Sequence, residues 1–311
     1  MTVSSMGDLF LATVNARGLK QNMKRLAMFR YFKQQHYDII CLQETHLTKQ
    51  DIPIWEKQWG GKIIYVEGTA HSQGEMILIS KKLNCEVNII KQRSRLLVIH
   101  LKGEGVDVVI ANVYAPNLKA EKKIFFDLIF ENLNDFEGSQ VIIMGDFNGV
   151  INNDLDIVSG NPHCTQDVQR FSQTMSRLNV IDVWRVLHAD QKAYTWSKAQ
   201  PFIARRLDYC FVSDNVMQSC VSCDIVSLPN TDHRAVILRL STSSFVRGPG
   251  YWRFNNSYLK DPVFVDELNN MLENALTEEM QISNIQTVWD LTKVKIRDFC
   301  IDYGKKQSLK V

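Results

Sequence analysis

The sequence predicts an α/β protein built as a layered sandwich, followed by a separate helical tail. Short apolar runs rich in Ile and Val, bounded by turn residues, recur through residues 1–240 of the 311 and have the length of strands. Segments with apolar residues at three- and four-residue spacing lie between some of these runs. Strands and helices that alternate only in part favour packed layers of sheet and helix.

The expected strands share short stretches of aliphatic and β-branched side chains. They are Leu9–Val14, Asp38–Leu42, Lys62–Val66, Glu75–Ser80, Leu96–Leu101, Val106–Tyr114, Val141–Gly145, Tyr209–Ser213 and Ala235–Leu240. The expected helices carry their apolar side chains on one face. They are Met23–Gln34, Ala120–Leu133 and Gln166–Leu178.

The composition changes near Ser241. Residues 241–244 (Ser-Thr-Ser-Ser) and 247–250 (Arg-Gly-Pro-Gly) have the chemistry of turns and linkers. Beyond them, Pro262–Leu276 and Ile285–Tyr303 have the pattern of amphipathic helices. We therefore predict one domain over 1–241, followed by a linker and helical tail over 242–311.

Composition excludes several classes of protein. Hydrophobic residues make up 45% and charged residues 23%, which excludes a disordered or collagen-like chain. The formal charge is only +2, so contact with nucleic acid would need a local basic surface. The seven scattered cysteines do not form a disulfide framework, and we read Cys220 and Cys223 as thiols of a strand region. The sequence shows no signal peptide and no apolar span. We therefore expect an intracellular protein, nuclear or cytoplasmic, with no membrane partner.

Polar and charged residues gather at the ends of the expected strands. Ligand sites in layered α/β proteins collect there, because loops from separate strands converge. A single such residue is more often a solvated cap, but six pieces of this kind occur in this chain. They are Asn15, Gln43-Glu44-Thr45, Asn112-Val-Tyr114-Ala-Pro116-Asn117, Gly145-Asp146-Phe147-Asn148, Arg206-Leu207-Asp208-Tyr209 and Thr231-Asp232-His233.

In this order, the pieces resemble the endonuclease/exonuclease/phosphatase superfamily over about residues 8–240. They are most similar to its apurinic/apyrimidinic (AP) endonuclease-like branch. Residues 250–257 (Gly-Tyr-Trp-Arg-Phe-Asn-Asn-Ser) resemble the segment after the endonuclease domain in the second open reading frame of LINE-type (non-LTR) retrotransposons. The resemblance implies a four-layer α/β sandwich, with two packed mixed sheets flanked by helices.

Hydrolysis of a phosphodiester requires a nucleophilic water, a metal that offsets the phosphate charge, and stabilisation of the leaving 3′ oxygen. Glu44 offers the hard oxygen that Mg²⁺ prefers, and the resemblance implies this role as well, with Asn15 beside it on metal-bound water or phosphate. Asp146 is expected to orient or deprotonate the water. Asn148 is expected to project on the same side of an extended segment and to hold phosphate or nucleophile. The alternative for this run is an Asx-type turn.

Asp208 and His233 suggest an Asp–His pair, in which the carboxylate fixes the imidazole tautomer and favours its charged form. A charged imidazole would stabilise the pentacovalent transition state. Tyr114 is expected to donate its hydroxyl to the same phosphate, unless it is a core aromatic with one wet end, and Asn117 is expected to contact the phosphate backbone. The resemblance implies a second metal or water ligand at Asp232. The expected cofactor is Mg²⁺, with Mn²⁺ as a substitute, and no small-molecule cofactor is expected.

The hairpin before the Arg-Leu-Asp-Tyr run departs from the repair enzymes. They carry a Trp in the wall of the abasic pocket where this chain has Arg205, so a preference for abasic sites is not expected. The hairpin resembles that of the retrotransposon nucleases, which probes the DNA groove. Arg205 and Arg206 would suit a narrow minor groove, and Thr195 is expected to contact the DNA backbone.

The leading hypothesis is a Mg²⁺-dependent endonuclease that nicks one strand of double-stranded DNA and leaves a 3′-hydroxyl. In a complete LINE element that end primes reverse transcription. An AP-site repair endonuclease or a phosphatase of the same fold remains an alternative, and so does a catalytically silent DNA-binding relic. The chain has no Tyr/Phe-Ala-Asp-Asp polymerase motif, so contact with element RNA is expected only through further domains.

Overall fold

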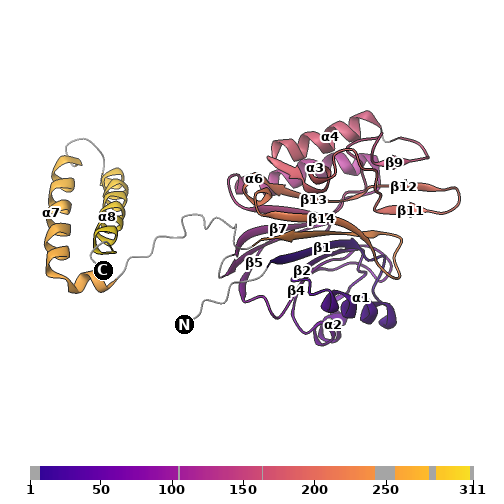
Figure 1. Cartoon of the computed structure of the whole chain (residues 1–311), viewed down its shortest axis with the longest axis horizontal. Helices are drawn as coiled ribbons and strands as arrows, with labels where there is room; N and C mark the ends of the chain where they lie inside the picture. Colours follow the sequence, from indigo (N-terminus) through magenta and orange to yellow (C-terminus); the bar gives the residue numbers. More distant parts are fainter. Residues whose placement is uncertain (1–7, 104–105, 163, 242–255, 280–284, 309–311) are drawn as a thin grey trace. The chain divides into compact units, whose positions relative to one another are not determined.

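The structure, a computed structural model, divides into two compact units, Met1–Arg247 and Gly248–Val311 (Figure 1). It describes residues 8–103, 106–162, 164–241, 256–279 and 285–308. The predicted domain boundary and linker chemistry after residue 241 lie outside the described residues, as does most of the 250–257 motif. These three features stay predictions.

A six-stranded mixed sheet, here called sheet A, contains the first strand of the chain near its centre. Its order is β14 (Cys220–Ser227), β15 (Arg234–Leu240), β1 (Leu9–Asn15), β2 (Ile39–Gln43), β4 (Glu75–Ile79) and β3 (Lys62–Val66). β1 pairs parallel with β2 and antiparallel with β15. Almost every residue of β1 is buried, as expected for a strand covered on both faces.

A second six-stranded mixed sheet, sheet B, has its own central parallel pair. Its order is β10 (Val180–Asp182), β13 (Asp208–Ser213), β8 (Val141–Asp146), β7 (Val106–Tyr114), β6 (Leu96–Gly103) and β5 (Cys85–Arg93). Parallel strands need a crossover connection, which α3 (Lys119–Leu133) supplies between β7 and β8. A small third sheet has the order β11 (Trp196–Lys198), β12 (Ile203–Arg205) and β9 (Ile157–Val158).

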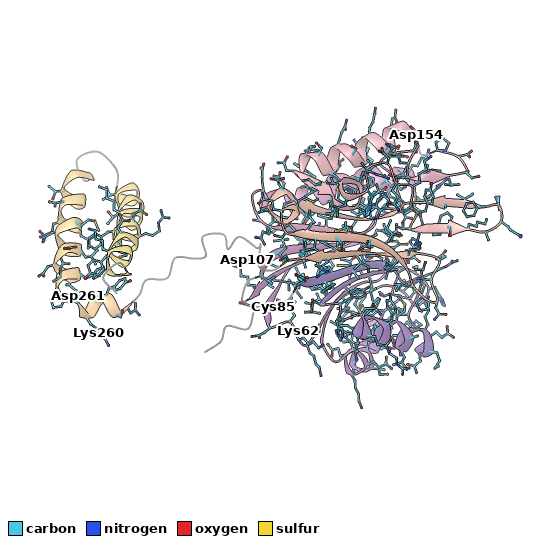
Figure 2. The ribbon with its side chains drawn as sticks, in the orientation of Figure 1. Lys62, Cys85, Asp107, Asp154, Lys260 and Asp261 are labelled. Atoms are coloured by element: carbon cyan, nitrogen blue, oxygen red, sulfur yellow. The ribbon has the colours of Figure 1, made fainter. Side chains whose placement is uncertain are left out.

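The two large sheets pack face to face, and helices cover their outer faces (Figure 1). α1 (Asn22–Gln34) and α2 (Ile52–Trp59) pack on sheet A, and α3 and α4 (Thr165–Arg177) pack on sheet B. Buried aliphatic side chains of both sheets form the interior between them. Figure 2 draws the described side chains on the ribbon. The short helices α5 (Val183–Leu187) and α6 (Asp214–Met217) lie against β14 and β13 respectively. The predicted four-layer α/β sandwich is confirmed.

Every strand and helix predicted within residues 8–241 is present, with ends shifted by at most two residues. The sequence did not predict α2, β5, β9, β10 or the short helices. It gave no bounds for β14, although Cys220 and Cys223 were read as part of a strand region, or for β11 and β12, although a hairpin was expected there. β14 mixes Ser, Cys and Asp with few aliphatic residues, because an edge strand needs only part of its surface buried. α2 has only eight residues and a Pro in its first turn, too short for a clear periodic pattern.

The second unit, described by itself, is a pair of helices. It contains η4 (Asn256–Lys260), α7 (Pro262–Glu279) and α8 (Ile285–Ser308). Phe264, Cys300 and Tyr303 form its buried core. Both helices were predicted, and each extends three to five residues beyond its predicted end. Among the residues that the structure describes, no helix is both long and apolar enough to cross a membrane.

Candidate active site

Strand ends from both large sheets meet at one edge of the first unit. In sheet A, parallel pairing sets Asn15 opposite the residue that precedes Glu44. In sheet B, Tyr114 lies opposite Asp146 in a parallel pair, and Asp208 lies opposite Asp146 in an antiparallel pair. Asp146 ends its strand and Asp208 begins its own, so antiparallel pairing brings both carboxylates to the same edge.

Hydrogen bonds join the two sheets at this edge. Asn15 Nδ2 donates to Asp146 Oδ2 over 2.9 Å, and Gln43 Nε2 donates to Asn112 Oδ1 over 2.6 Å. All four side chains are buried. A buried polar group without a partner costs about 1–3 kcal/mol, so these bonds fix the strand ends of one sheet against those of the other.

His233 lies between two carboxylates. Its Nδ1 is 2.8 Å from Asp208 Oδ2, and its Nε2 is 4.0 Å from Asp146 Oδ2. Burial alone would lower the pKa of His233, but the charge of Asp208 and the hydrogen bond outweigh it and raise that pKa to about 9. The imidazole is therefore positively charged at neutral pH. Its Nδ1 donates to Asp208, and its Nε2 proton faces Asp146.

Asp146 is only 1% exposed. Burial, followed by the charge of Asp208, raises its pKa to about 7, although His233 and the hydrogen bond from Asn15 act in the opposite direction. A carboxyl group with a pKa near neutrality exchanges its proton readily at neutral pH, which suits it to general-base chemistry.

The turn after β8 is tight. The Asn148 amide donates to Asp146 Oδ1 over 2.8 Å, and Asn148 has a left-handed φ of 46°. The predicted extended segment is therefore wrong, and the Asx-type turn given as its alternative is what forms. Lys122 Nζ donates to the carbonyl of Asn148 and holds the turn from α3. Gly145 is required here, because a Cβ would lie 1.9 Å from the carbonyl oxygen of Val113.

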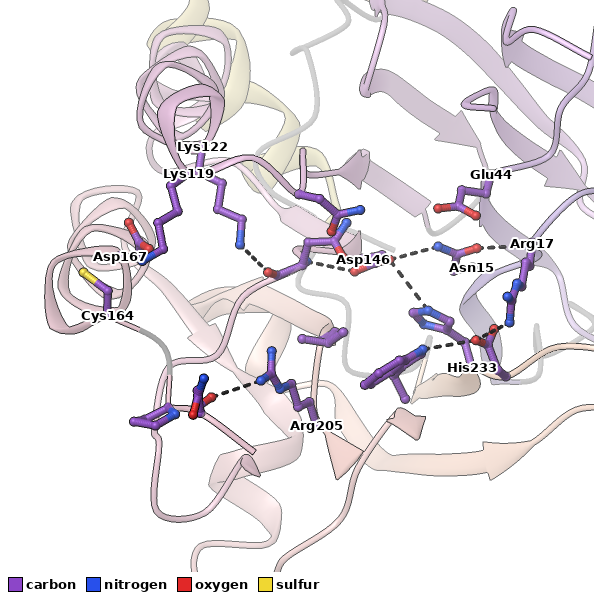
Figure 3. A pocket seen from close by; sticks show the side chains of 17 residues that line it. Asn15, Arg17, Glu44, Lys119, Lys122, Asp146, Cys164, Asp167, Arg205 and His233 are labelled. Carbon is purple, nitrogen blue, oxygen red and sulfur yellow. Dashed lines mark hydrogen bonds and ion pairs between the residues drawn. The ribbon is translucent and has the colours of Figure 1, made fainter. Parts of the chain in front are cut away.

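Glu44 lies at the pocket (Figure 3). Its backbone has a left-handed φ of 48°, and the hydroxyl of Tyr114 donates to its Oε1. Burial, together with this hydrogen bond, raises the pKa of Tyr114, so its hydroxyl keeps its proton. Nearby, Arg17 forms an ion pair with Asp232.

These groups open into one cavity of about 700 Å³ (Figure 3). The cavity has the size of an ordinary ligand site, and carboxylates, amides and basic side chains line it together. The lining residues that the sequence predicted are Asn15, Glu44, Asn117, Asp146, Asn148, Arg205, Asp232 and His233. Tyr114 and Asp208 lie directly behind this lining, in contact with Glu44 and His233.

The sequence model of the Endonuclease/Exonuclease/phosphatase family matches residues 12–233, which run from β1 to the imidazole at the cavity. The chain belongs to this family. The residues matched include the strand-end side chains that surround the cavity.

Two curated proteins and one solved structure are similar to this chain. The "Transposon TX1 uncharacterized 149 kDa protein" of Xenopus laevis is 26% identical over 307 residues, covering 96% of this chain and 23% of that protein. The chain thus spans about a quarter of the length of its transposon relative. The exodeoxyribonuclease of Bacillus subtilis strain 168 is 24% identical over 258 residues, covering 73% of this chain and 98% of that protein. The AP endonuclease LMAP from Leishmania major has the same fold, with a TM-score of 0.65 and 18% identity over 76% of this chain and 88% of that chain.

The family and the exodeoxyribonuclease relative together indicate a hydrolase of the nuclease type. The predicted resemblance to this superfamily and to a transposon protein is confirmed.

Two groups of side chains offer ligand atoms for a cation. Asp146, Asp208 and His233 have ligand atoms within 4.8 Å of one another. However, both nitrogens of a charged imidazole carry protons, so His233 cannot ligate a metal in that form. Glu44 offers an ionisable oxygen without this conflict. Asp232 Oδ1 is buried and has no hydrogen-bond partner among the described residues, so it is free to accept a ligand. Carboxylate oxygens of this kind fit Mg²⁺.

Two predicted substrate contacts lie away from the cavity. Thr195 is fully buried, and its hydroxyl accepts from two backbone amides at the start of β13 over 2.9 and 3.0 Å. Arg206 is 1% exposed and forms ion pairs with Asp156 and Asp182. Contact with DNA is therefore wrong for both in this structure. Thr195 positions the strand that carries Asp208, and Arg206 neutralises buried carboxylates beneath the hairpin.

Arg206 and Arg205 are expected to behave differently when each is replaced by Met. Arg206→Met should lower the free energy of unfolding by about 3 kcal/mol, because removing one partner of a buried ion pair leaves an uncompensated charge. Arg205, which lines the cavity, is the matched control. Arg205→Met should leave stability within about 1 kcal/mol of wild type. Urea unfolding of both variants checks this, and equal loss of stability would contradict the assignment of Arg206.

Sequence reasoning missed three basic residues at the cavity, namely Arg17, Lys119 and Lys122. Arg17 follows Asn15 by two residues, and the two lysines open α3 directly after Asn117. Their closeness to predicted site residues was the available signal. However, a charged side chain in the first turn of a helix usually points into solvent. Only the fold shows that these two lysines face the cavity.

Proposed function

We propose that this chain is a Mg²⁺-dependent endonuclease that nicks one strand of double-stranded DNA and leaves a 3′-hydroxyl. The observation that carries the proposal is the buried Asp208–His233 pair set against Asp146 at a cavity of about 700 Å³. The pair provides a positive charge for a phosphate, and Asp146 provides a base beside it. Both would favour in-line attack of water on a phosphodiester.

Asp146 is the proposed base. Its Oδ2 accepts from Asn15 and its Oδ1 accepts from the Asn148 amide, so the carboxylate is fixed in orientation. A water held by this carboxylate would lose its proton to Asp146 as it attacks phosphorus. Asn15 and Asn148 keep side-chain amide atoms at the cavity, where they are proposed to hold the water and the phosphate.

His233 is the proposed electrostatic stabiliser. Asp208 holds the imidazole by Nδ1, which leaves the Nε2 proton to donate to a non-bridging phosphate oxygen. Charge on the phosphate oxygens increases as the pentacovalent transition state forms, so a fixed cation there binds the transition state more tightly than the substrate. Burial of the pair strengthens this effect, because little water screens it.

Glu44, with Asn15 and Asp232, is the proposed holder of the divalent cation. A bound Mg²⁺ would offset phosphate charge and stabilise the leaving 3′ oxygen, and Mn²⁺ has similar oxygen preferences. Arg17 pairs with Asp232 in this structure and so limits the negative charge of this wall.

Double-stranded DNA is the proposed substrate. Arg17, Lys119, Lys122 and Arg205 line a cavity that is also lined by the proposed catalytic groups, so phosphates on either side of the scissile bond would meet positive charge. The hairpin of β11 and β12 lies next to the cavity, which Trp196 and Arg205 line from its base. In a complete transposon protein, the nick would prime copying of an element RNA bound by other domains. A chromosomal target would place this step in the nucleus.

The test is conversion of supercoiled plasmid to open circles with Mg²⁺ or with EDTA. We expect conversion only with Mg²⁺, and 3′-end mapping should show hydroxyl ends. Duplexes with and without one abasic site should be cut at similar rates, because the sequence resemblance implies Arg205 at the position of the abasic-pocket Trp. Strong preference for the abasic duplex would favour the repair alternative. Binding without turnover at any Mg²⁺ concentration would favour a silent DNA-binding relic.

Tyr114→Phe should raise the Mg²⁺ concentration required for half-maximal nicking by about 10–100-fold. The substitution removes only the hydroxyl that donates to Glu44, and loss of such a supporting hydrogen bond typically costs that much in metal affinity or activity. A Mg²⁺ titration of the nicking rate measures it. Tyr65→Phe, on β3, is the control and should titrate like wild type. An unchanged titration for Tyr114→Phe would contradict the proposed place of the cation.

A further inference from the structure

A buried carboxyl group lies between the two large sheets, near the strand ends that carry the catalytic groups. Glu75 begins β4 and is fully buried. Leu42 pairs with Met76 between β2 and β4, and both face the helices of sheet A. Gln43 and Glu75, the adjoining residues at this edge, therefore face the interior between the sheets. None of the catalytic roles proposed above uses Glu75.

The carboxyl group of Glu75 lacks a partner. Among the described residues, neither of its oxygens forms a hydrogen bond of normal geometry. Burial raises the pKa of Glu75 to about 7, although the backbone amide and the charge of Arg95, in the turn between β5 and β6, lower it. The facing residues of β2 and β3, Gln43 and Val66, are uncharged. An ionised carboxylate in this interior would be far more costly than the neutral acid.

Gln43 has an unpartnered oxygen as well. Its Nε2 donates to Thr13 Oγ1 over 2.9 Å and to Asn112 Oδ1 over 2.6 Å. Its Oε1 is buried and accepts no hydrogen bond in the part of the chain that the structure describes. Extending the register of β2 and β4 by one residue sets Gln43 opposite Glu75, where Cβ atoms are about 4.5–5.5 Å apart. Two adjacent buried acceptors are both satisfied when one of them carries a proton.

We propose that Glu75 is a positioning residue of the catalytic site, with a carboxyl proton that it donates to Gln43 Oε1. The bond satisfies both orphaned oxygens and leaves no charge between the sheets. A hydrogen bond made by the neutral acid also favours the neutral form further. The inference rests on the proposed nuclease function, because the site that Glu75 would position is the one proposed to cut DNA.

Gln43 connects this bond to the proposed cation site. It precedes Glu44, pairs with Asn15 at the end of β1, and crosses to Asn112 on sheet B. Asn112 lies two residues before Tyr114, whose hydroxyl donates to Glu44. Fixing Gln43 therefore fixes the approach of the two sheets at the point where Tyr114 meets Glu44. Glu75 is not among the residues that line the catalytic cavity, so it would act only through these neighbours.

The test compares Glu75→Met with Glu75→Gln in a Mg²⁺ titration of plasmid nicking at pH 6.5. Glu75→Met keeps the side-chain length but has no donor. It should raise the Mg²⁺ concentration for half-maximal nicking by about 10-fold, the lower end of what loss of a supporting hydrogen bond near a metal costs. Glu75→Gln has an amide N–H that can donate to Gln43, so it should titrate like wild type. At saturating Mg²⁺ both variants should nick at the wild-type rate.

The pH dependence of stability detects the proton without any nicking. The pKa of Glu75 is raised from its ordinary value of 4.5 to about 7, so the neutral acid stabilises the fold fully below about pH 4.5 and this stability is lost as pH rises through 7. Glu75→Gln stays neutral, so its melting temperature relative to wild type should rise from pH 5.5 to pH 8. Asp146 titrates alike in both chains and cancels. Glu86→Gln, on the exposed surface of β5, should show a constant difference.

Three results would overturn the inference. The first is a Mg²⁺ requirement raised as much by Glu75→Gln as by Glu75→Met, because the ionised carboxylate would then be the form in use. The second is a folded Glu75→Met that titrates like wild type. The third is a melting difference between Glu75→Gln and wild type that does not change with pH. A wild type that does not nick would instead refute the proposed nuclease function, and the melting comparison would still decide whether Glu75 carries the proton.

Discussion

Asp146→Asn is expected to lower the nicking rate of supercoiled plasmid by about 10²–10⁴-fold, the usual contribution of a general base. The amide cannot accept the proton of the attacking water. It also replaces one of the two oxygens that accept from Asn15 and from the Asn148 amide, so the turn loses part of its hydrogen bonding. Single-turnover nicking at saturating Mg²⁺ isolates the chemical step from binding.

The fold should survive this change. The pKa of Asp146 is higher in the folded chain than in the unfolded one, so the group stabilises the fold fully below about pH 3.8 and this stability is lost as pH rises to about 7. Above pH 7 the buried carboxylate is charged and destabilises the fold. The melting temperature of Asp146→Asn at pH 8 should therefore be no lower than that of wild type. Asp154→Asn, an exposed loop acid, is the control and should nick normally. Nicking within tenfold of wild type for Asp146→Asn would end the assignment of the base.

Sequence reasoning succeeded where chemistry lies at strand ends. Asn15, Tyr114, Asp146 and His233 are far apart in the chain, yet each adjoins a buried strand that the Ile and Val pattern predicts. Strand ends converge when neighbouring strands of one sheet run in the same direction, because their carboxyl ends then lie at the same edge. The pairing of β1 with β2 and of β7 with β8 meets that requirement.

Sequence reasoning failed where the direction in which a side chain points decides its role. Arg205 and Arg206 are neighbours with equal charge, but the one lines the cavity and the other lies under the hairpin with Asp156. Successive residues of an extended chain point to opposite sides, so a one-residue difference in register exchanges these roles. No composition or spacing argument resolves a single residue of register. The same holds for Asn148, whose left-handed backbone replaces an expected extension.

The arrangement of charges at the catalytic cavity explains why the net charge of the chain does not indicate whether it binds DNA. Basic side chains at its wall face a centre of buried carboxylates, and the opposite signs nearly cancel when the whole chain is counted. Yet a DNA phosphate would meet the basic wall first and would reach the acidic centre only when a cation accompanies it. Local arrangement, and not net charge, therefore determines whether this surface attracts DNA.

Asp208→Asn is expected to reduce nicking at pH 7.5 by about 10²-fold and to move the pH optimum toward acid. Burial is the largest single influence on the pKa of His233 and lowers it, and without Asp208 only the smaller effects of the Asp146 and Asp232 charges oppose it. The pKa of His233 therefore falls in the variant, and the imidazole stabilises charge on the phosphate less at pH 7.5. The loss of Asp208 also lowers the pKa of Asp146, because that charge is the second cause of its elevation. Both changes move activity in the same direction along the pH scale.

The pH profile of the wild type provides the reference. Its alkaline limb should lie near pH 9, where His233 loses its proton, and its acid limb at or below pH 7, because a bound cation lowers the pKa of a nearby carboxyl. Nicking rates from pH 5.5 to 10 at fixed ionic strength measure both limbs. Asp224→Asn, on exposed β14 surface, should keep the wild-type profile. A variant that merely misfolds would have lower nicking rates at every pH, with its alkaline limb at the wild-type pH. Loss of the Asp208–His233 pair would move the alkaline limb itself to lower pH. An alkaline limb that stays at pH 9 in Asp208→Asn would therefore show that the imidazole is not the group whose charge the reaction uses.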